Sequence, residues 1–122
     1  MPKKFLIIDD EKDMTELTSA VLSLSGYSCE IFNDPVQGLA RLGRGGIDGL
    51  VVDLMMPQMT GQALIEELRR QPSLAALPVF VLSAKNLTAD ERKRLLALGV
   101  HFIPKPFSTR RLSELVRQHV PS

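Results

Sequence analysis

The chain has 122 residues, 44% of them hydrophobic, which is enough to fill the core of one domain. Its 15 lysines and arginines nearly balance its 14 aspartates and glutamates, so overall charge gives no reason to expect binding to nucleic acid or to a membrane surface. The lone cysteine, Cys29, excludes an intrachain disulfide and is typical of a reducing cytoplasm.

Two further classes are disfavoured by the sequence. The N-terminal run MPKKFLII reaches acidic residues too early for a signal peptide, and no apolar run approaches the roughly 18 residues of a membrane span. His101 and His119 have no neighbouring cysteine or histidine in the sequence, so we expect no zinc site.

The first half of the chain alternates short apolar runs with segments of helical periodicity. Residues 4–8 (KFLII) predict a strand, and the helix after it ends at Gly26, a typical C-terminal residue. The expected core stripe of this helix is Met14, Leu17, Val21 and Leu24. A second strand over 28–32 (SCEIF) leads to a short helix over 35–42, and 47–52 (IDGLVV) predict a third strand.

The same alternation continues to the end of the chain. A helix over 61–70 is followed by a strand over 79–83 (VFVLS), and Thr88 or Asp90 caps the next helix. Residues 101–103 (HFI) predict the fifth strand, after which Ser108 opens the last helix. The side chains expected to face the core are Leu64, Ile65 and Leu68 of the helix over 61–70, and Leu112, Leu115 and Val116 of the last helix. In the helix between them, Leu95, Leu96 and Leu98 precede Gly99.

Five strands alternating with five helices predict an α/β fold, with one domain over residues 1–122 and a parallel sheet. In such a sheet the crossovers are right-handed, so the carboxyl ends of all the strands lie along one edge. Ligands bind at that edge.

Reactive side chains follow four of the predicted strands. Asp9 and Asp10 end the first strand, Asp53 the third and Ser83 the fourth, while Lys105 follows the fifth. Three carboxylates held together repel one another unless a cation lies among them, and Mg²⁺ suits such oxygen ligands. A metal ion, a lysine and a hydroxyl that surround the third carboxylate can bind a phosphoryl group. Asp53 is then the expected nucleophile.

These motifs resemble the receiver domain of two-component response regulators over the whole chain. The residues that carry the resemblance are LIIDDE, VVDLMMPQMTG, VFVLSA and FIPKPF. The resemblance implies a flavodoxin-like, doubly wound sheet of strand order 2-1-3-4-5, with Mg²⁺ as the required ion. It also implies that a histidine kinase or histidine phosphotransfer protein phosphorylates Asp53.

The resemblance assigns roles position by position. Asp9 and Asp10 match the acidic pair that holds the metal with Asp53 and the backbone carbonyl of Met55. Ser83 matches the switch hydroxyl, Lys105 the phosphoryl-binding lysine and Phe102 the aromatic switch residue. Phe102 departs from the tyrosine often found there and, having no hydroxyl, can signal only by burial. The peptide bond between Lys105 and Pro106 matches a position of the family where the bond is cis.

Charge distribution suggests where a partner docks. Residues 85–122 contain 8 basic and 3 acidic residues, whereas residues 1–84 contain 7 basic and 11 acidic residues. The predicted output surface of helix four, strand five and helix five lies in this cationic part, and an output partner or a second copy in a homodimer is expected there. No direct contact with nucleic acid or membrane is expected.

Three other interpretations remain open at this point. A phosphatase or phosphotransferase of the haloacid dehalogenase type needs a second aspartate where this chain has Met55. A flavodoxin needs a phosphate-binding loop where this chain has DDEKD, which would repel the flavin phosphate. A receiver that never turns over phosphate would act only as an interaction module. The preferred interpretation is a cytoplasmic signalling domain that catalyses only its own phosphorylation and dephosphorylation.

Overall fold

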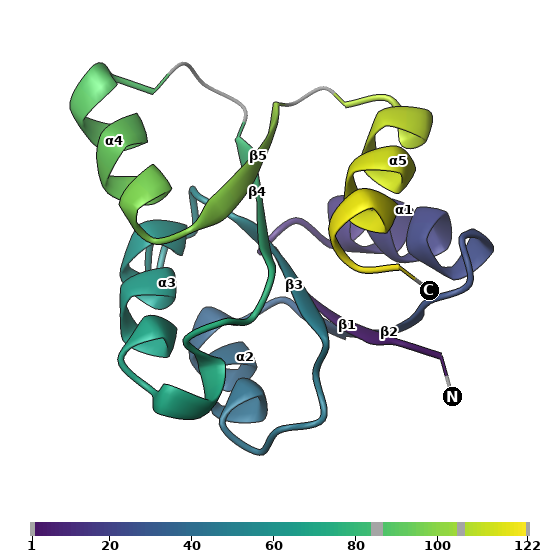
Figure 1. The fold of residues 1–122 in the computed structure, drawn as a ribbon, viewed down its shortest axis with the longest axis horizontal. Helices are drawn as coiled ribbons and strands as arrows, with labels where there is room; N and C mark the ends of the chain where they lie inside the picture. The colour runs from purple at the N-terminus through teal and green to yellow at the C-terminus, as the bar shows by residue number, and fades with distance from the viewer. Residues whose placement is uncertain (1, 84–86, 105–106, 122) are drawn as a thin grey trace.

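Strands and helices alternate along the described part of the chain (Figure 1). The computed structural model describes residues 2–83, 87–104 and 107–121, and it describes Ser83 and Pro104 by their backbone alone. The elements are β1 (Lys4–Ile8), α1 (Lys12–Leu24), β2 (Ser28–Phe32), α2 (Pro35–Leu42), β3 (Gly49–Asp53), α3 (Gly61–Arg69), the 3₁₀ turn η1 (Pro72–Leu74), β4 (Val79–Ser83), α4 (Ala89–Ala97), β5 (Val100–Pro104) and α5 (Thr109–His119).

The five strands form one parallel sheet in the order β2-β1-β3-β4-β5, which confirms the predicted fold class and strand order. Ile8 at the end of β1 pairs with Phe32 and Val52, and Asp53 at the end of β3 pairs with Leu82. This register aligns the carboxyl ends of the strands at one edge of the sheet.

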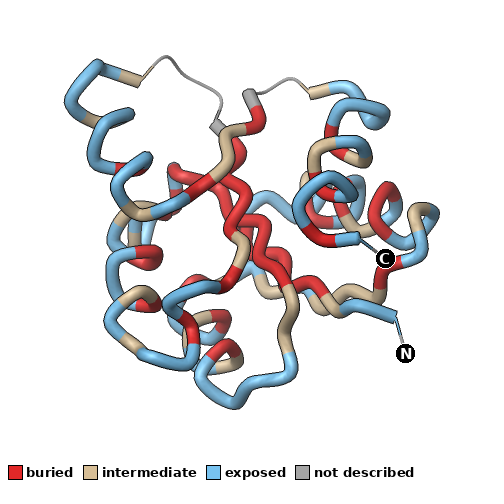
Figure 2. Tube along the Cα trace, viewed as in Figure 1, coloured by how far each residue is buried: buried red, intermediate tan, exposed pale blue. Residues whose placement is uncertain are grey.

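Helices cover both faces of the sheet, so the strands are apolar on both sides. Figure 1 shows α1 and α5 on one face and α2, α3 and α4 on the other, and Figure 2 shows the buried strands between these layers. Successive strand residues point to opposite faces: Val51 packs with α1 and α5, and Val52 with the other three helices. Each such buried side chain stabilises the fold by roughly 1.5–3 kcal/mol.

The predicted core stripe of α1 is partly wrong. Leu17 and Leu24 are 45% and 91% exposed, whereas the helix buries Thr15, Thr18, Val21 and Leu22. The hydroxyl of Thr15 donates to the Lys12 carbonyl oxygen at 2.8 Å, so its polar atom is satisfied within the helix although the residue is buried. Two threonines thus occupy core positions for which leucines were predicted.

Several boundaries differ by one or two residues from the prediction. The third strand begins at Gly49 and includes Asp53, because the Leu54 amide still donates to the Leu82 carbonyl oxygen at 3.3 Å. The turn η1 was not predicted. Thr88, one of two candidates, caps α4 in a reciprocal capping box with Glu91.

Arg69 joins the end of α3 to its surroundings through its guanidinium group. The carbonyl oxygens that accept its hydrogen bonds are those of Leu74, Ala75, Leu77, Leu98 and Gly99. These bonds hold η1 and the turn between α4 and β5 against α3, at the edge of the sheet opposite the carboxyl ends of the strands.

His101 of β5 and His119 of α5 lie together although the sequence separates them. Their ring centroids are 3.7 Å apart with an interplanar angle of 20°, and the Phe80 ring lies beside both.

The described ranges contain no helix with the length and apolar character that a bilayer crossing requires.

Candidate functional site

Three carboxylates converge at the carboxyl edge of the sheet. Asp9 and Asp53 are buried and Asp10 is exposed, and one carboxylate oxygen from each lies within 4.8 Å of the others. Asp9 and Asp10 follow β1, and Asp53 ends the neighbouring β3. The structure therefore brings together the three aspartates that the sequence predicted to form one cluster.

Backbone hydrogen bonds determine where Asp9 lies. Its amide donates to the Phe32 carbonyl oxygen at 3.2 Å, which extends the pairing of β1 with β2 by one residue. Its Oδ1 accepts a hydrogen bond from the Glu11 amide at 3.0 Å. The aspartate thereby begins the turn that leads the chain from the buried strand into α1.

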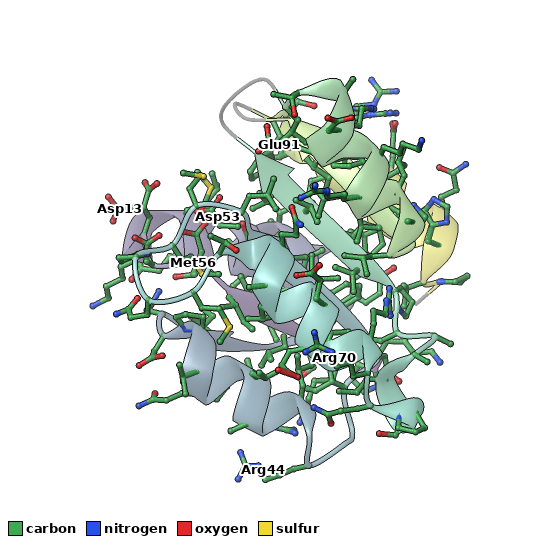
Figure 3. All side chains as sticks on the ribbon, turned by 90° about the vertical axis from the view of Figure 1, so that its left-hand side faces the viewer. Asp13, Arg44, Asp53, Met56, Arg70 and Glu91 are labelled. Carbon is green, nitrogen blue, oxygen red and sulfur yellow. The ribbon has the colours of Figure 1, made fainter. Side chains whose placement is uncertain are left out.

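The loop between β3 and α3 folds back on the end of its own strand. The Gly61 amide donates to the Leu54 carbonyl oxygen at 2.9 Å, and Thr60 caps α3 by accepting a hydrogen bond from the Ala63 amide at 3.1 Å. Figure 3 shows Asp53 and Met56 beside this loop, with Arg44 at the bottom of the view. Met56 is buried, whereas the Met55 side chain is 54% exposed.

The remaining predicted site residues are described to different extents. Ser83 ends β4, and its backbone pairs with Pro104 at the same edge of the sheet. Lys105, together with the predicted cis bond to Pro106, lies outside the described residues. The role predicted for the Met55 backbone carbonyl stays a prediction.

Phe102 lies in the middle of β5, on the face of the sheet that α4 covers. Its ring is partly buried against the cluster of α2, α3 and α4, and the Arg92 guanidinium lies 4.6 Å from the ring centroid. This cation–π contact was not predicted. A planar cation above the ring covers an aromatic side chain that the core only partly buries.

Asn33 is a site residue that the sequence analysis missed. It follows β2 directly, and its Nδ2 donates to the Asp9 carbonyl oxygen at 2.8 Å and to Thr15 Oγ1 at 3.2 Å. The signal was available, because the rule that drew attention to residues after strand ends also applies to β2, the neighbour of β1.

The donor set of this cluster can bind a metal ion. Its ligands are carboxylate oxygens, which favour a hard divalent cation over a transition metal that prefers nitrogen or sulfur. Of the three aspartates only Asp10 is exposed, and on its side of the cluster a bound ion would keep water molecules.

Comparison with known proteins agrees with this geometry. A family model described as the response regulator receiver domain matches residues 5–117. Response regulator MprA of Mycobacterium leprae is 33% identical over 114 residues, which make up 93% of this chain and 49% of that protein. The chain spans about half the length of the curated relatives it matches.

Solved structures show the same fold. The response regulator receiver protein of Pseudomonas putida is 26% identical, with 98% of both chains covered and a TM-score of 0.88. Chemotaxis response regulator CheY4 of Vibrio cholerae is 24% identical, with 97% of this chain and 98% of that chain covered and a TM-score of 0.88. The family match favours neither the dehalogenase-type phosphatase nor the flavodoxin.

Proposed function

The chain is a receiver domain of the two-component response regulator family, and from this premise we propose that Asp53 accepts a phosphoryl group in a Mg²⁺-dependent reaction. The observation that supports the proposal is the convergence of Asp9, Asp10 and Asp53 within 4.8 Å at the carboxyl edge of the sheet. A kinase or phosphotransfer partner follows from the family, and a histidine kinase or histidine phosphotransfer protein is the donor we propose.

In the proposed reaction a carboxylate oxygen of Asp53 attacks the phosphorus of a phosphohistidine in line with the leaving nitrogen. The new O–P bond forms as the N–P bond breaks, and the leaving imidazole keeps the electron pair and takes up a proton. Asp9, Asp10, Asp53 and the Met55 carbonyl would hold Mg²⁺, which when bound neutralises charge on the phosphoryl oxygens.

Two residues complete the proposed site. Ser83 would donate its hydroxyl to one phosphoryl oxygen, and the Lys105 ammonium would pair with another. Ser83 ends β4, the neighbour of β3, and Lys105 follows β5, the next strand beyond β4. Drawing these side chains toward the new oxyanions would transmit phosphorylation to β4 and β5.

The proposed output surface comprises α4, β5 and α5. Its exposed basic residues include Arg92, Lys93, Arg94, Arg110 and Arg111. Phosphorylation would shift the population between two states of this surface, including the burial of Phe102 beneath Arg92. An output partner or a second copy of the chain would dock there through acidic residues. We place this signalling in the cytoplasm, where the lone thiol of Cys29 stays reduced.

Intact mass after incubation with acetyl phosphate and Mg²⁺ tests the proposal. The native protein should gain one labile phosphoryl group, and Asp53→Asn should gain none because an amide cannot act as the nucleophile. Asp13→Asn is the matched control, since Asp13 is an exposed aspartate of the first turn of α1 outside the cluster. Normal incorporation into Asp53→Asn would refute the assignment, and no incorporation into native protein would favour an interaction module.

Amide chemical shifts measured with and without the phosphodonor test the output surface. Shifts are expected in α4, β5 and α5, next to the strands that end in Ser83 and precede Lys105. Shifts confined to α2 would contradict this surface.

A further inference from the structure

Asn33, Thr15 and the loop between β1 and α1 form a hydrogen-bonded unit beside the three carboxylates. We propose that Asn33 is a positioning residue for the acidic cluster: its amide fixes the backbone that carries Asp9 and Asp10, and it thereby sets the affinity for the divalent ion. This inference rests on the proposed function of the cluster.

The Asn33 side chain takes the place of a backbone donor in the sheet. In a parallel ladder, a residue donates to one partner carbonyl and accepts from the amide two positions further along the partner strand. The Asp9 amide donates to Phe32, so its carbonyl would accept from the amide of Asp34. Asp34 instead caps α2, where its Oδ1 accepts from the Val36 amide at 2.8 Å. Asn33 Nδ2 provides the donor, at 2.8 Å.

Thr15 extends the same connection into α1. It is fully buried, and its Oγ1 accepts from Asn33 Nδ2 at 3.2 Å and donates to the Lys12 carbonyl oxygen at 2.8 Å. Glu11, the N-cap residue of α1, makes no capping hydrogen bond through its side chain. The start of α1 is therefore joined to β2 through Thr15 and Asn33.

Asp10 lies between these fixed points. Asp9 is held at its amide, carbonyl and Oδ1, and the Lys12 carbonyl is held by Thr15. Asp10 is the exposed member of the cluster. The backbone on both sides of Asp10 therefore determines where its carboxylate lies relative to Asp9 and Asp53.

Removal of the Asn33 side-chain amide would release the backbone that carries Asp9 and Asp10 without removing a metal ligand. Partners that orient metal ligands typically change metal affinity by 10–100-fold when they are lost. We expect about 10-fold weaker Mg²⁺ binding for Asn33→Ala, because one hydrogen bond still holds the Asp9 amide. Thr15→Val should act in the same direction, whereas Thr15→Ser keeps the hydroxyl and should bind Mg²⁺ like native protein.

The test is a Mg²⁺ titration followed by amide chemical shifts, with urea unfolding of each variant in parallel. Asp34→Ala is the matched control: it removes the neighbouring side chain and a helix cap, which lowers stability, but it leaves the Asp9 carbonyl bonded. The expected result is weakened Mg²⁺ binding in Asn33→Ala and Thr15→Val alone.

Each alternative result has a separate meaning. Equal affinity in native protein and Asn33→Ala would overturn the positioning role. Equal losses in Asn33→Ala and Asp34→Ala would also overturn it, because general destabilisation would then explain both. Absence of Mg²⁺ binding in native protein would instead refute the proposed function on which this role rests.

Discussion

Gly61 provides a direct test of how closely α3 packs against β3, the strand that ends in Asp53. A Cβ atom added at Gly61 would lie 2.4 Å from the Asp53 carbonyl oxygen and 2.8 Å from Leu54 Cα. Ordinary contact begins near 3.4 Å, so helix and strand must separate by about 1 Å. The obstructing atoms belong to the backbone of a central strand, which cannot rotate away as a side chain can.

We expect Gly61→Ala to lower the free energy of unfolding by about 2–3 kcal/mol, the upper part of the range for overpacking. A domain of this size has roughly 5–15 kcal/mol of stability, so the variant should still fold. Displacing Asp53 by a large fraction of 1 Å should slow its phosphorylation about 10–100-fold, because in-line attack depends on position.

Urea unfolding and the rate of phosphoryl incorporation from acetyl phosphate measure the two effects. Gly43→Ala is the control: a Cβ at Gly43 meets its nearest atom at 3.5 Å and the backbone is already helical. That variant should be neutral or up to about 1 kcal/mol more stable, with an unchanged rate. Native stability and rate in Gly61→Ala would show that the close approach imposes no constraint.

Three further predictions concern stability. Arg69→Met removes the guanidinium that donates to five carbonyl oxygens and should lower the free energy of unfolding by about 2–3 kcal/mol in urea. An unchanged midpoint would show that these bonds contribute nothing. Hydrogen bonding to Arg41 is the main cause that lowers the pKa of Glu30 from 4.5 to about 2, so stability should fall as pH drops through this interval. The loss should be about 1 kcal/mol after solvent screening, and a Glu30→Gln variant with the same acid dependence would contradict it. Burial, with a smaller contribution from His119, lowers the pKa of His101 below 6.5. The unfolded chain therefore binds a proton at this histidine more readily than the folded chain, and stability should fall as pH drops below 6.5. His101→Phe should flatten this part of the pH profile, and a native profile that is already flat would refute the argument.

The fold could be predicted because its main determinants are local. Apolar runs such as 4–8 and 79–83, separated by helical segments, are compatible with few arrangements other than a parallel sheet covered on both faces. The meeting of Asp9, Asp10 and Asp53 followed from the same rule, since all three end neighbouring parallel strands.

Features that depend on the path of the chain in three dimensions could not be predicted from sequence patterns. Thr15 and Thr18 of α1 are buried although a hydrophobicity pattern reads threonine as polar, and Leu17 and Leu24 were wrongly placed in the core. Asn33 replaces a backbone donor only because Asp34 turns away into α2. The contact of His101 with His119 depends on where the last turn of α5 meets β5.

The division of the core by the sheet has a consequence for how substitutions combine. Among the described residues, buried side chains that face α1 and α5, such as Ile7 and Leu112, form one cluster, and those that face α2, α3 and α4, such as Ile8 and Leu64, form another. Free-energy changes on opposite faces should therefore add, whereas changes within one face should couple. Substitutions on one face of the sheet should then need compensating changes on that face alone. The two halves of the core can vary separately while the carboxylates at the edge of the sheet keep their arrangement.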